Sequence, residues 1–375
     1  MKVYLDNAAT TKIDSRVLQK MLPFLKETYG NASSIHEQGQ IARRAIEESR
    51  NIIAKKIDAL PEEIIFTSGA TESNNLVILG VAKCLKKKGN HIITSQIEHS
   101  SVLNACKNLA LKGFQITYLP VTKEGVVKPE LVERAITKKT ILVSIMHANN
   151  ETGTIQNINS FADICARKGI LFHTDCVQSF LKVPFSLKKI SADFVSLSAH
   201  KIHGPKGTGA LFVRKNITLS PLFFGGNQEN KLRPGTENVS GIVGFAKASL
   251  LLKKTNCNKM KFLQNRCVRE LLRIPKITIH NLNSKKVCNI INFSIENVSS
   301  EDLLKYLNCR KIYVSSASAC SSHEKSSHVL EAMGLSKIES ENSIRISLSK
   351  FTTTREISFF LRELKKICIA IQKCS

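Results

Sequence analysis

Short strand-like segments alternate with helical segments from about residue 14 to residue 255, and this alternation restricts the possible folds more than any other feature. The strand-like runs are residues 64–67, 91–94, 115–118, 141–145, 171–174 and 194–197. Helical spacing of apolar residues is found in segments 15–29, 37–57 and 71–87. This alternation predicts an α/β fold with a mostly parallel sheet sandwiched by helices.

The pattern changes near residue 251. A Lys-rich helix follows, then short strands at residues 277–280, 289–294 and 344–347 and a closing helix. Thr353 and Glu356 have capping-box spacing at the start of that last helix. We therefore expect a smaller α+β domain at residues 256–375 beside a large domain at residues 15–255. Residues 1–14 would form an N-terminal arm that packs with the small domain.

The chain is strongly basic, because 55 Lys and Arg residues outnumber 30 Asp and Glu residues and give a net charge of +25. Such an excess can indicate nucleic-acid binding. Here the basic residues are scattered, with one tight cluster at residues 86–88, and no nucleic-acid motif accompanies them. The charge therefore favours a Lys-rich proteome or an acidic protein partner, and we expect no direct contact with nucleic acid.

No apolar run approaches the ~18 residues that a membrane span needs. The first residues show neither a signal-peptide pattern nor an amphipathic leader. We expect a cytoplasmic protein with no membrane contact. Eleven cysteines are present, none in a CxxC pair, so the sequence predicts no metal site and no thioredoxin-like chemistry. Most lie in apolar segments, which suits a reducing compartment.

Ligands of parallel α/β sheets bind at the carboxyl ends of the strands, and polar residues follow several strands here. Lys201 comes after the strand at 194–197, with Ser198 and His200 beside it. A lysine held at a strand end is a candidate Schiff-base amine, because a desolvated amine loses its proton readily. Alone this signal is weak, since most such tetrapeptides are ordinary solvated strand ends.

The other strand ends supply complementary chemistry. Residues 68–75 open a helix with small residues, which suits a phosphate, although an ordinary N-cap would look the same. His99, Asn150 and the pair Asp175 and Gln178 follow three further strands. Each would alone be an ordinary polar cap. Together they supply a lysine, a carboxylate, a ring stacker and phosphate donors, which is the set that pyridoxal phosphate needs.

Across essentially its whole length the chain resembles the cysteine desulfurases of the NifS/IscS group, within the fold-type I pyridoxal-phosphate enzymes that are similar to class V aminotransferases. The matching segments are residues 4–11, 31–36, 66–73, 98–99, 149–153, 175–178, 198–201, 233–238, 316–321 and 343–347. The resemblance implies conversion of L-cysteine to L-alanine by a homodimer. The sulfur would pass to a protein acceptor that serves iron–sulfur cluster assembly, tRNA thiolation or both.

The resemblance also implies roles for individual residues. Lys201 would form the Schiff base and move the α-proton. Asp175 would pair with the pyridinium nitrogen, Gln178 would hydrogen-bond the phenolic oxygen, and His99 would stack on the ring and shuttle protons. The remaining residues would hold the phosphate (Ala70, Thr71, Ser198, His200 and, from the other subunit, Thr236), or the substrate carboxylate (Asn150, which would also contact the cofactor, and Arg345).

Cys320 is the expected nucleophile. It lies in a run of small residues, 315–322, which predicts a loop. By resemblance its thiolate would attack the substrate sulfur and become a persulfide. Two other readings stay open. An aminotransferase or β-lyase on the same fold would turn over without Cys320, and a basic nucleic-acid-associated scaffold would bind duplexes without a cofactor.

Overall fold

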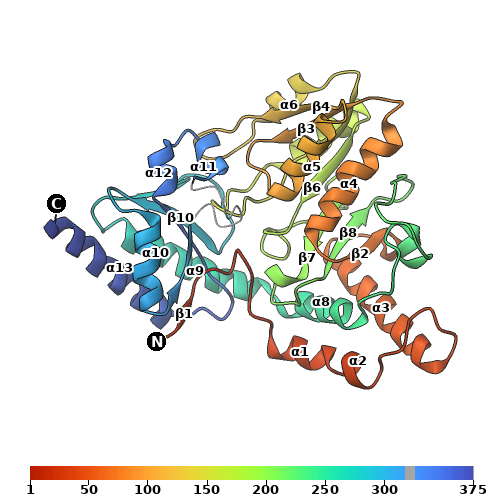
Figure 1. Cartoon of the computed structure of the whole chain (residues 1–375), viewed down its shortest axis with the longest axis horizontal. Coiled ribbons are helices and arrows are strands. Elements are labelled where there is room, and N and C mark those ends of the chain that lie inside the picture. Colours follow the sequence, from red (N-terminus) through yellow and green to blue (C-terminus); the bar gives the residue numbers. More distant parts are fainter. Residues whose placement is uncertain (317–325, 375) are drawn as a thin grey trace.

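The computed structural model describes residues 1–316 and 326–374, and these contain a seven-stranded and a four-stranded β-sheet flanked by helices, together with a two-stranded sheet (Figure 1). The segment with the expected nucleophile Cys320 lies outside the described residues. Within the described ranges, every helix is too short or too polar to span a membrane.

The larger sheet has seven strands in the order β2-β8-β7-β6-β5-β3-β4. β8 pairs antiparallel with both of its neighbours, and the pairs among β7, β6, β5, β3 and β4 are parallel. The predicted α/β fold with a mostly parallel sheet is confirmed. Its strands are β2 (Ile64–Thr67), β3 (His91–Ser95), β4 (Gln115–Leu119), β5 (Thr140–Ser144), β6 (Leu171–Asp175), β7 (Phe194–Ser198) and β8 (Gly209–Val213).

Helices cover both faces of this sheet because its strands alternate apolar side chains between the two faces. On β7, Phe194 packs with the helices α4 (Ala70–Leu85) and α5 (Ser100–Ala110), whereas Val195 joins the core beneath α3 (Glu37–Lys56), α7 (Ile158–Lys168) and α8 (Val239–Leu251). Every residue of β3, β5, β7 and β8 is buried. The two-sided burial explains why the strands are near-continuous apolar runs.

Two local expectations need correction. The helical pattern at residues 15–29 forms two short helices, α1 (Ser15–Met21) and α2 (Pro23–Lys26), because Pro23 has no N–H to continue the first helix and begins the second. Strand β8 was not expected, because it begins with Gly209, and glycine is unfavourable in strands. The remaining large-sheet helix is α6 (Pro129–Ala135).

The second sheet is antiparallel, with the order β12-β13-β10-β9. The capping box of its last helix is confirmed: Thr353 N donates to Glu356 Oε2 (2.7 Å), and Glu356 N donates to Thr353 Oγ1 (3.2 Å). The strands are β9 (Ile277–Ile279), β10 (Ile290–Ile295), β12 (Ser315–Ser316) and β13 (Ser343–Ser347), and the helices are α9 (Lys254–Leu271), α10 (Ser300–Cys309), α11 (His328–Ala332), α12 (Lys337–Glu341) and α13 (Thr354–Cys374).

The N-terminal segment connects the four-stranded sheet to the seven-stranded sheet. Its strand β1 (Val3–Tyr4) pairs in parallel with β11 (Ile312–Tyr313), and Ser347 N donates to Leu5 O (2.6 Å). A few residues later Thr11 N donates to His200 O (3.0 Å), beside the end of β7. The segment therefore runs from β13 of the small sheet to the lysine turn of the large sheet, and both ends contribute to the site.

Candidate active site

A cavity of about 430 Å³ lies at the carboxyl ends of the large-sheet strands, where the parallel topology predicts a ligand. It brings together residues that are far apart in sequence. The expected site residues that line it are Ala70, Thr71, His99, Asn150, Asp175, Gln178, Ser198, His200, Lys201 and Arg345. Thr236 is exposed and is not part of the cavity lining within this one chain.

Lys201 enters the cavity from a short 3-10 turn (Ala199–Lys201) directly after the buried strand β7. Its ammonium donates to the backbone oxygens of Ala8 (2.6 Å) and Ala9 (2.8 Å). The N-terminal segment therefore holds the amine in the cavity. A local sequence pattern could not have revealed this contact, because more than 190 residues separate its partners.

Asp175 ends strand β6 and is 6% exposed. Its Oδ1 accepts from Val177 N (2.9 Å), and its Oδ2 accepts from Nδ2 of Asn74 on α4 (2.8 Å). Asn74 also donates to Ser101 Oγ (2.9 Å) and is fully buried. Sequence reasoning assigned no role to Asn74, which comes directly after the matching segment 66–73. The structure identifies it as the residue that orients the carboxylate.

His99 is the N-cap of α5, and its Nδ1 accepts from Ser101 N (3.1 Å). The neutral ring therefore carries its proton on Nε2. Burial lowers the pKa of His99, the Lys201 ammonium lowers it further, and the Asp175 carboxylate opposes both effects. The imidazole is consequently neutral at physiological pH.

The first turn of α4 provides a site for an anion. Gly69 precedes it with φ = +155°, a conformation that only glycine adopts readily. The backbone at Gly209 passes so close that an added Cβ there would lie 2.7 Å from Gly69 Cα. The N–H groups at the start of this 16-residue helix have no intrahelical acceptor. Lys201 and Lys206 also line the cavity, so its charge favours a phosphate.

His200 lies at the same end of the cavity. Its Nδ1 contacts Thr10 Oγ1 (3.1 Å), and burial together with nearby lysines lowers the pKa of His200 to about 4. A neutral His200 contributes a hydrogen bond to this site and leaves the positive charge to the lysines. Thr10 is a further residue that sequence reasoning did not assign.

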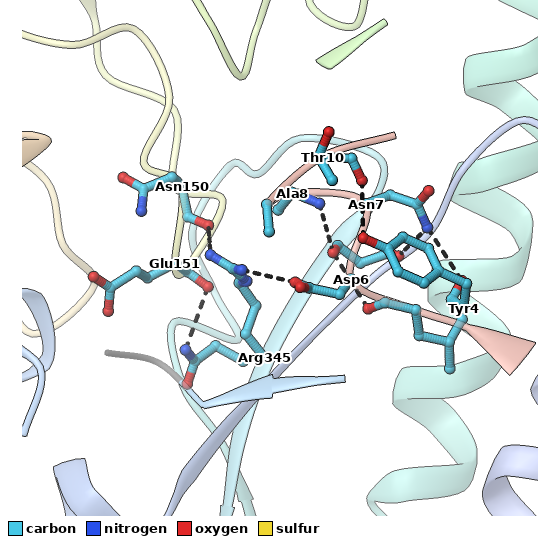
Figure 2. A network of polar contacts seen from close by, with 12 residues as sticks. Tyr4, Asp6, Asn7, Ala8, Thr10, Asn150, Glu151 and Arg345 are labelled. Atoms are coloured by element: carbon cyan, nitrogen blue, oxygen red, sulfur yellow. Dashed lines mark hydrogen bonds and ion pairs between the residues drawn. The ribbon is translucent and has the colours of Figure 1, made fainter. Parts of the chain in front are cut away.

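Arg345 projects from β13 of the other sheet and is 1% exposed. Figure 2 shows its guanidinium between Asn150 and Asp6: Nη1 donates to Asn150 O (3.0 Å) and Nη2 donates to Asp6 Oδ1 (2.9 Å). Its Nε is buried and has no hydrogen-bond partner among the described residues. A buried guanidinium with an unused donor at the cavity wall suits a carboxylate ligand.

The residues present fit pyridoxal phosphate. Gln178 Nε2 donates to Ala8 O (3.0 Å). Its Oε1 is buried and lacks a hydrogen-bond partner within the described part of the chain, which indicates that a bound ligand supplies the missing partner. A carboxylate, an amine, a neutral imidazole and a helix N-terminus surround the same space. Lys201 would carry the cofactor, Asp175 and Gln178 would contact its ring, and the start of α4 with Ser198 and His200 would hold its phosphate.

The ends of the segment that contains Cys320 are both anchored beside this cavity. Ser315 pairs with Arg345 in the β12–β13 ladder. Ser327 Oγ donates to the buried carboxylate of Glu151, the residue after Asn150. A second cavity of about 690 Å³ adjoins the first, and His99, Asn150 and His328 line it. Both ends of this segment are therefore anchored near Asn150 and Arg345, which line the first cavity.

The chain is similar to known proteins over nearly its full length. The sequence model of the family described as aminotransferase class-V matches residues 3–360. A curated relative, cysteine desulfurase IscS of Dictyoglomus turgidum, is 46% identical over 371 residues, which cover 98% of this chain and 94% of the relative. A solved structure of a NifS-like protein is 41% identical, has a TM-score of 0.92, and covers 98% of this chain and 99% of its own. A structure described as SspA in complex with cysteine is 37% identical, has a TM-score of 0.85, and covers 94% of this chain and 100% of its own.

Proposed function

Because this chain belongs to the class V aminotransferase family and is a pyridoxal-phosphate-dependent cysteine desulfurase, we propose that Cys320 receives the sulfur and passes it to an acceptor protein. The reaction converts L-cysteine and the Cys320 thiol into L-alanine and a Cys320 persulfide. The observation that carries the proposal is the convergence of Lys201, Asp175 and Arg345 on one cavity, from two different sheets.

Pyridoxal phosphate, when bound, supplies an electron sink that stabilises negative charge on the α-carbon of an amino acid. Asp175, whose orientation is held by Asn74 and Val177, would support this chemistry by accepting a hydrogen bond from the ring nitrogen. Gln178 would hydrogen-bond the phenolic oxygen. Ala70 and Thr71 would bind the phosphate through the helix N-terminus, together with Ser198 and His200.

Lys201 Nζ and His99 Nε2 move the protons. Lys201 would hold the cofactor, and its amine would take the proton from the substrate α-carbon and return one to the product. His99 is neutral because burial lowers its pKa, so its imidazole can stack on the ring and exchange a proton with the substrate thiol.

Arg345 and Asn150 bind the substrate carboxylate. The guanidinium is already oriented by Asp6 and by the Asn150 carbonyl, so little side-chain entropy is lost when a carboxylate binds. Asn150 would also contact the cofactor, since it lines the same cavity as Lys201 and Arg345.

Cys320 is the sulfur acceptor of the active site. It is four residues after Ser316, and four residues span at most about 14 Å of chain. Since Ser315 pairs with Arg345 and Ser327 bonds to Glu151, a thiol within this segment can reach a substrate held by Arg345. The persulfide would then pass its sulfur to an acceptor for iron–sulfur cluster assembly or tRNA thiolation, in the cytoplasm.

The enzyme acts as a homodimer in this proposal. Thr236 is exposed and outside the cavity of its own chain, as expected for a residue that completes the phosphate site of a second subunit.

The division of the chain into an arm, a large domain and a small domain, with boundaries near residues 14 and 255, remains a prediction.

The test supplies L-cysteine and a thiol reductant to the purified enzyme and measures alanine and sulfide together. The desulfurase with Cys320 as nucleophile predicts equal amounts of both, lost in Cys320→Ala and kept in Cys309→Ala, which removes an exposed cysteine of α10. A β-lyase would instead release pyruvate and ammonia, and an aminotransferase would need a keto acid. Either product pattern, unaffected by Cys320→Ala, contradicts the Cys320 assignment.

A further inference from the structure

Glu98 is a buried carboxylic acid directly before His99, and the desulfurase reaction gives it no task. It lies in the short segment between β3 and α5 and is 1% exposed. Its Oε1 accepts from Ser95 Oγ (2.6 Å), and Met146 N lies within hydrogen-bond distance of both Oε1 (3.0 Å) and Oε2 (3.1 Å). The side chain therefore joins the end of β3 to the chain that follows β5.

The segment 146–149, which donates to the Glu98 carboxyl, also contacts Asp175. His147 N donates to Asp175 O (2.9 Å) at the end of β6. His99 and Asp175 line the same cavity. The bonds to residues 146–149 therefore connect the imidazole on one strand end to the carboxylate on another, around the space that the cofactor would occupy.

Two further hydrogen bonds hold the backbone just before His99. Asn149 Nδ2 donates to Ile97 O (2.9 Å), and Nε2 of His328, the first residue of α11, donates to Glu98 O (3.1 Å). Both acceptors are main-chain oxygens, so these contacts fix the path of the chain as it enters α5. The Glu98 side chain completes this set of contacts from inside the protein.

The Glu98 carboxyl is uncharged at neutral pH. Its hydrogen-bond partners in the described part of the chain are a hydroxyl and a backbone N–H. Burial raises the pKa of Glu98 to about 8, the hydrogen bonds from Ser95 and Met146 oppose this shift, and the Asp175 carboxylate adds to it. An uncharged acid both donates and accepts hydrogen bonds. It can therefore bridge two chain segments without placing a second negative charge near Asp175.

We propose that Glu98 is a positioning residue, whose carboxyl bridges the ends of β3 and β5 and thereby holds the His99 imidazole in the cavity. The inference rests on the proposed function, in which His99 exchanges a proton with the substrate, and adds how the ring is held. His99 is the N-cap of α5, so its place depends on how the chain enters that helix. A displacement of about 1 Å can slow a catalysed reaction about 100-fold.

The test measures how fast diethyl pyrocarbonate modifies His99 in the full-length enzyme without cofactor, so that the result does not depend on activity. Trypsin releases His99 in the peptide 89–107, which also contains His91. His91 is 4% exposed and contacts two threonine hydroxyls, so it reports general unfolding within the same peptide. Tandem mass spectrometry distinguishes the two modified positions.

Two substitutions of Glu98 separate the bridge from simple packing. Glu98→Met keeps a long buried side chain but removes the hydrogen bonds, so His99 should react about fivefold faster, the effect of losing about one hydrogen bond, while His91 stays protected. Glu98→Gln should restore the wild-type rate, because an uncharged amide can also donate and accept. Gln96→Ala, which changes an exposed side chain of the same segment, is the matched control and should leave both rates unchanged.

An unchanged His99 rate in folded Glu98→Met overturns the proposal. Equal acceleration at His91 and His99 also overturns it, because Glu98 would then support the whole sheet. Ser95→Ala removes one hydrogen bond to the carboxyl and carries the same test if Glu98→Met does not fold. A smaller acceleration at His99 is expected there, and an unchanged rate contradicts the bridge.

Steady-state kinetics of the holoenzyme provide a separate readout. In Glu98→Met the kcat should fall, while the KM for L-cysteine changes less, because Arg345 and Asn150 bind the substrate carboxylate in the proposed function. A raised KM with unchanged kcat would contradict a role through His99. If the wild type does not desulfurate cysteine, the proposed function fails, and the modification rates still decide whether Glu98 positions His99.

Discussion

Asp6 and Arg345 form an ion pair at the wall of the active-site cavity, with Oδ1 of Asp6 2.9 Å from Nη2 of Arg345. They are 339 positions apart in the sequence. The pair exists because the N-terminal segment hydrogen-bonds to β13, the strand that carries Arg345. The guanidinium expected to bind the substrate is thereby oriented, and part of its charge is balanced before the substrate arrives.

Asp6→Asn should strengthen substrate binding. The amide oxygen can still accept from Arg345 and keep its orientation, but the competing negative charge is gone. A partly exposed ion pair contributes up to about 1 kcal/mol, so the KM for L-cysteine should fall up to about fivefold. Steady-state kinetics measure this, with Arg345→Lys as the opposite control. If KM rises in both variants, the charge of Asp6 is needed for orientation.

Asn74→Ala should weaken cofactor binding. The substitution removes the donor to Asp175 Oδ2 and leaves the buried carboxylate without one of its two hydrogen bonds. A hydrogen bond to a charged group contributes about 1.5 kcal/mol, so the Kd for pyridoxal phosphate should rise about tenfold. Titration of the apoenzyme by absorbance measures the Kd.

The neighbouring residue provides the control for that experiment. Asn75→Ala removes side-chain hydrogen bonds only to backbone oxygens of Thr71 and Ser101, so its Kd should change much less. Equal effects of Asn74→Ala and Asn75→Ala would mean that α4 is perturbed as a whole.

His173 should make the stability of the enzyme depend on pH. It is fully buried between Ser144 Oγ (2.8 Å) and Ser196 Oγ (3.0 Å), and burial lowers the pKa of His173 to about 3. Below the unfolded-state pKa of about 6.5 the unfolded chain binds a proton that the folded chain does not. Stability is therefore present above pH 6.5 and is lost as the pH falls toward 3.

His173→Gln isolates this contribution, because glutamine can bond to both serines but does not titrate. Between pH 7 and pH 5 the wild type should lose about 2 kcal/mol more unfolding free energy than the variant. Urea unfolding at both pH values measures the difference. Parallel pH dependence of the two proteins would show that His173 is protonated in the folded state.

Thr236 should act in the site of the opposite subunit. Thr236→Ala and Lys201→Ala homodimers should both be impaired, while a hybrid dimer contains one site with Lys201 from one chain and Thr236 from the other. Random mixing should therefore restore about a quarter of the wild-type sites. Activity after mixing by reversible unfolding measures the recovery. No recovery, with hybrid dimers detected by native mass spectrometry, would place Thr236 in its own subunit's site.

The local pattern of the sequence determined the class of the fold and the elements that carry the chemistry. Apolar runs and helical spacing are properties of neighbouring residues, so they predicted six of the strands in the large sheet and the capping box at Thr353. The rule that ligands bind at carboxyl ends of parallel strands then brought Lys201, Asp175 and His99 to one edge. The cavity contains all three.

Tertiary structure alone decided the contacts that orient these groups. β8 was missed because Gly209, which weakens its strand pattern, is required by the close approach to Gly69. The pairs Asn74–Asp175 and Asp6–Arg345 join segments whose adjacency depends on strand order and chain crossing. Local periodicity carries no information about that order, because the same alternating pattern is compatible with several sheet topologies.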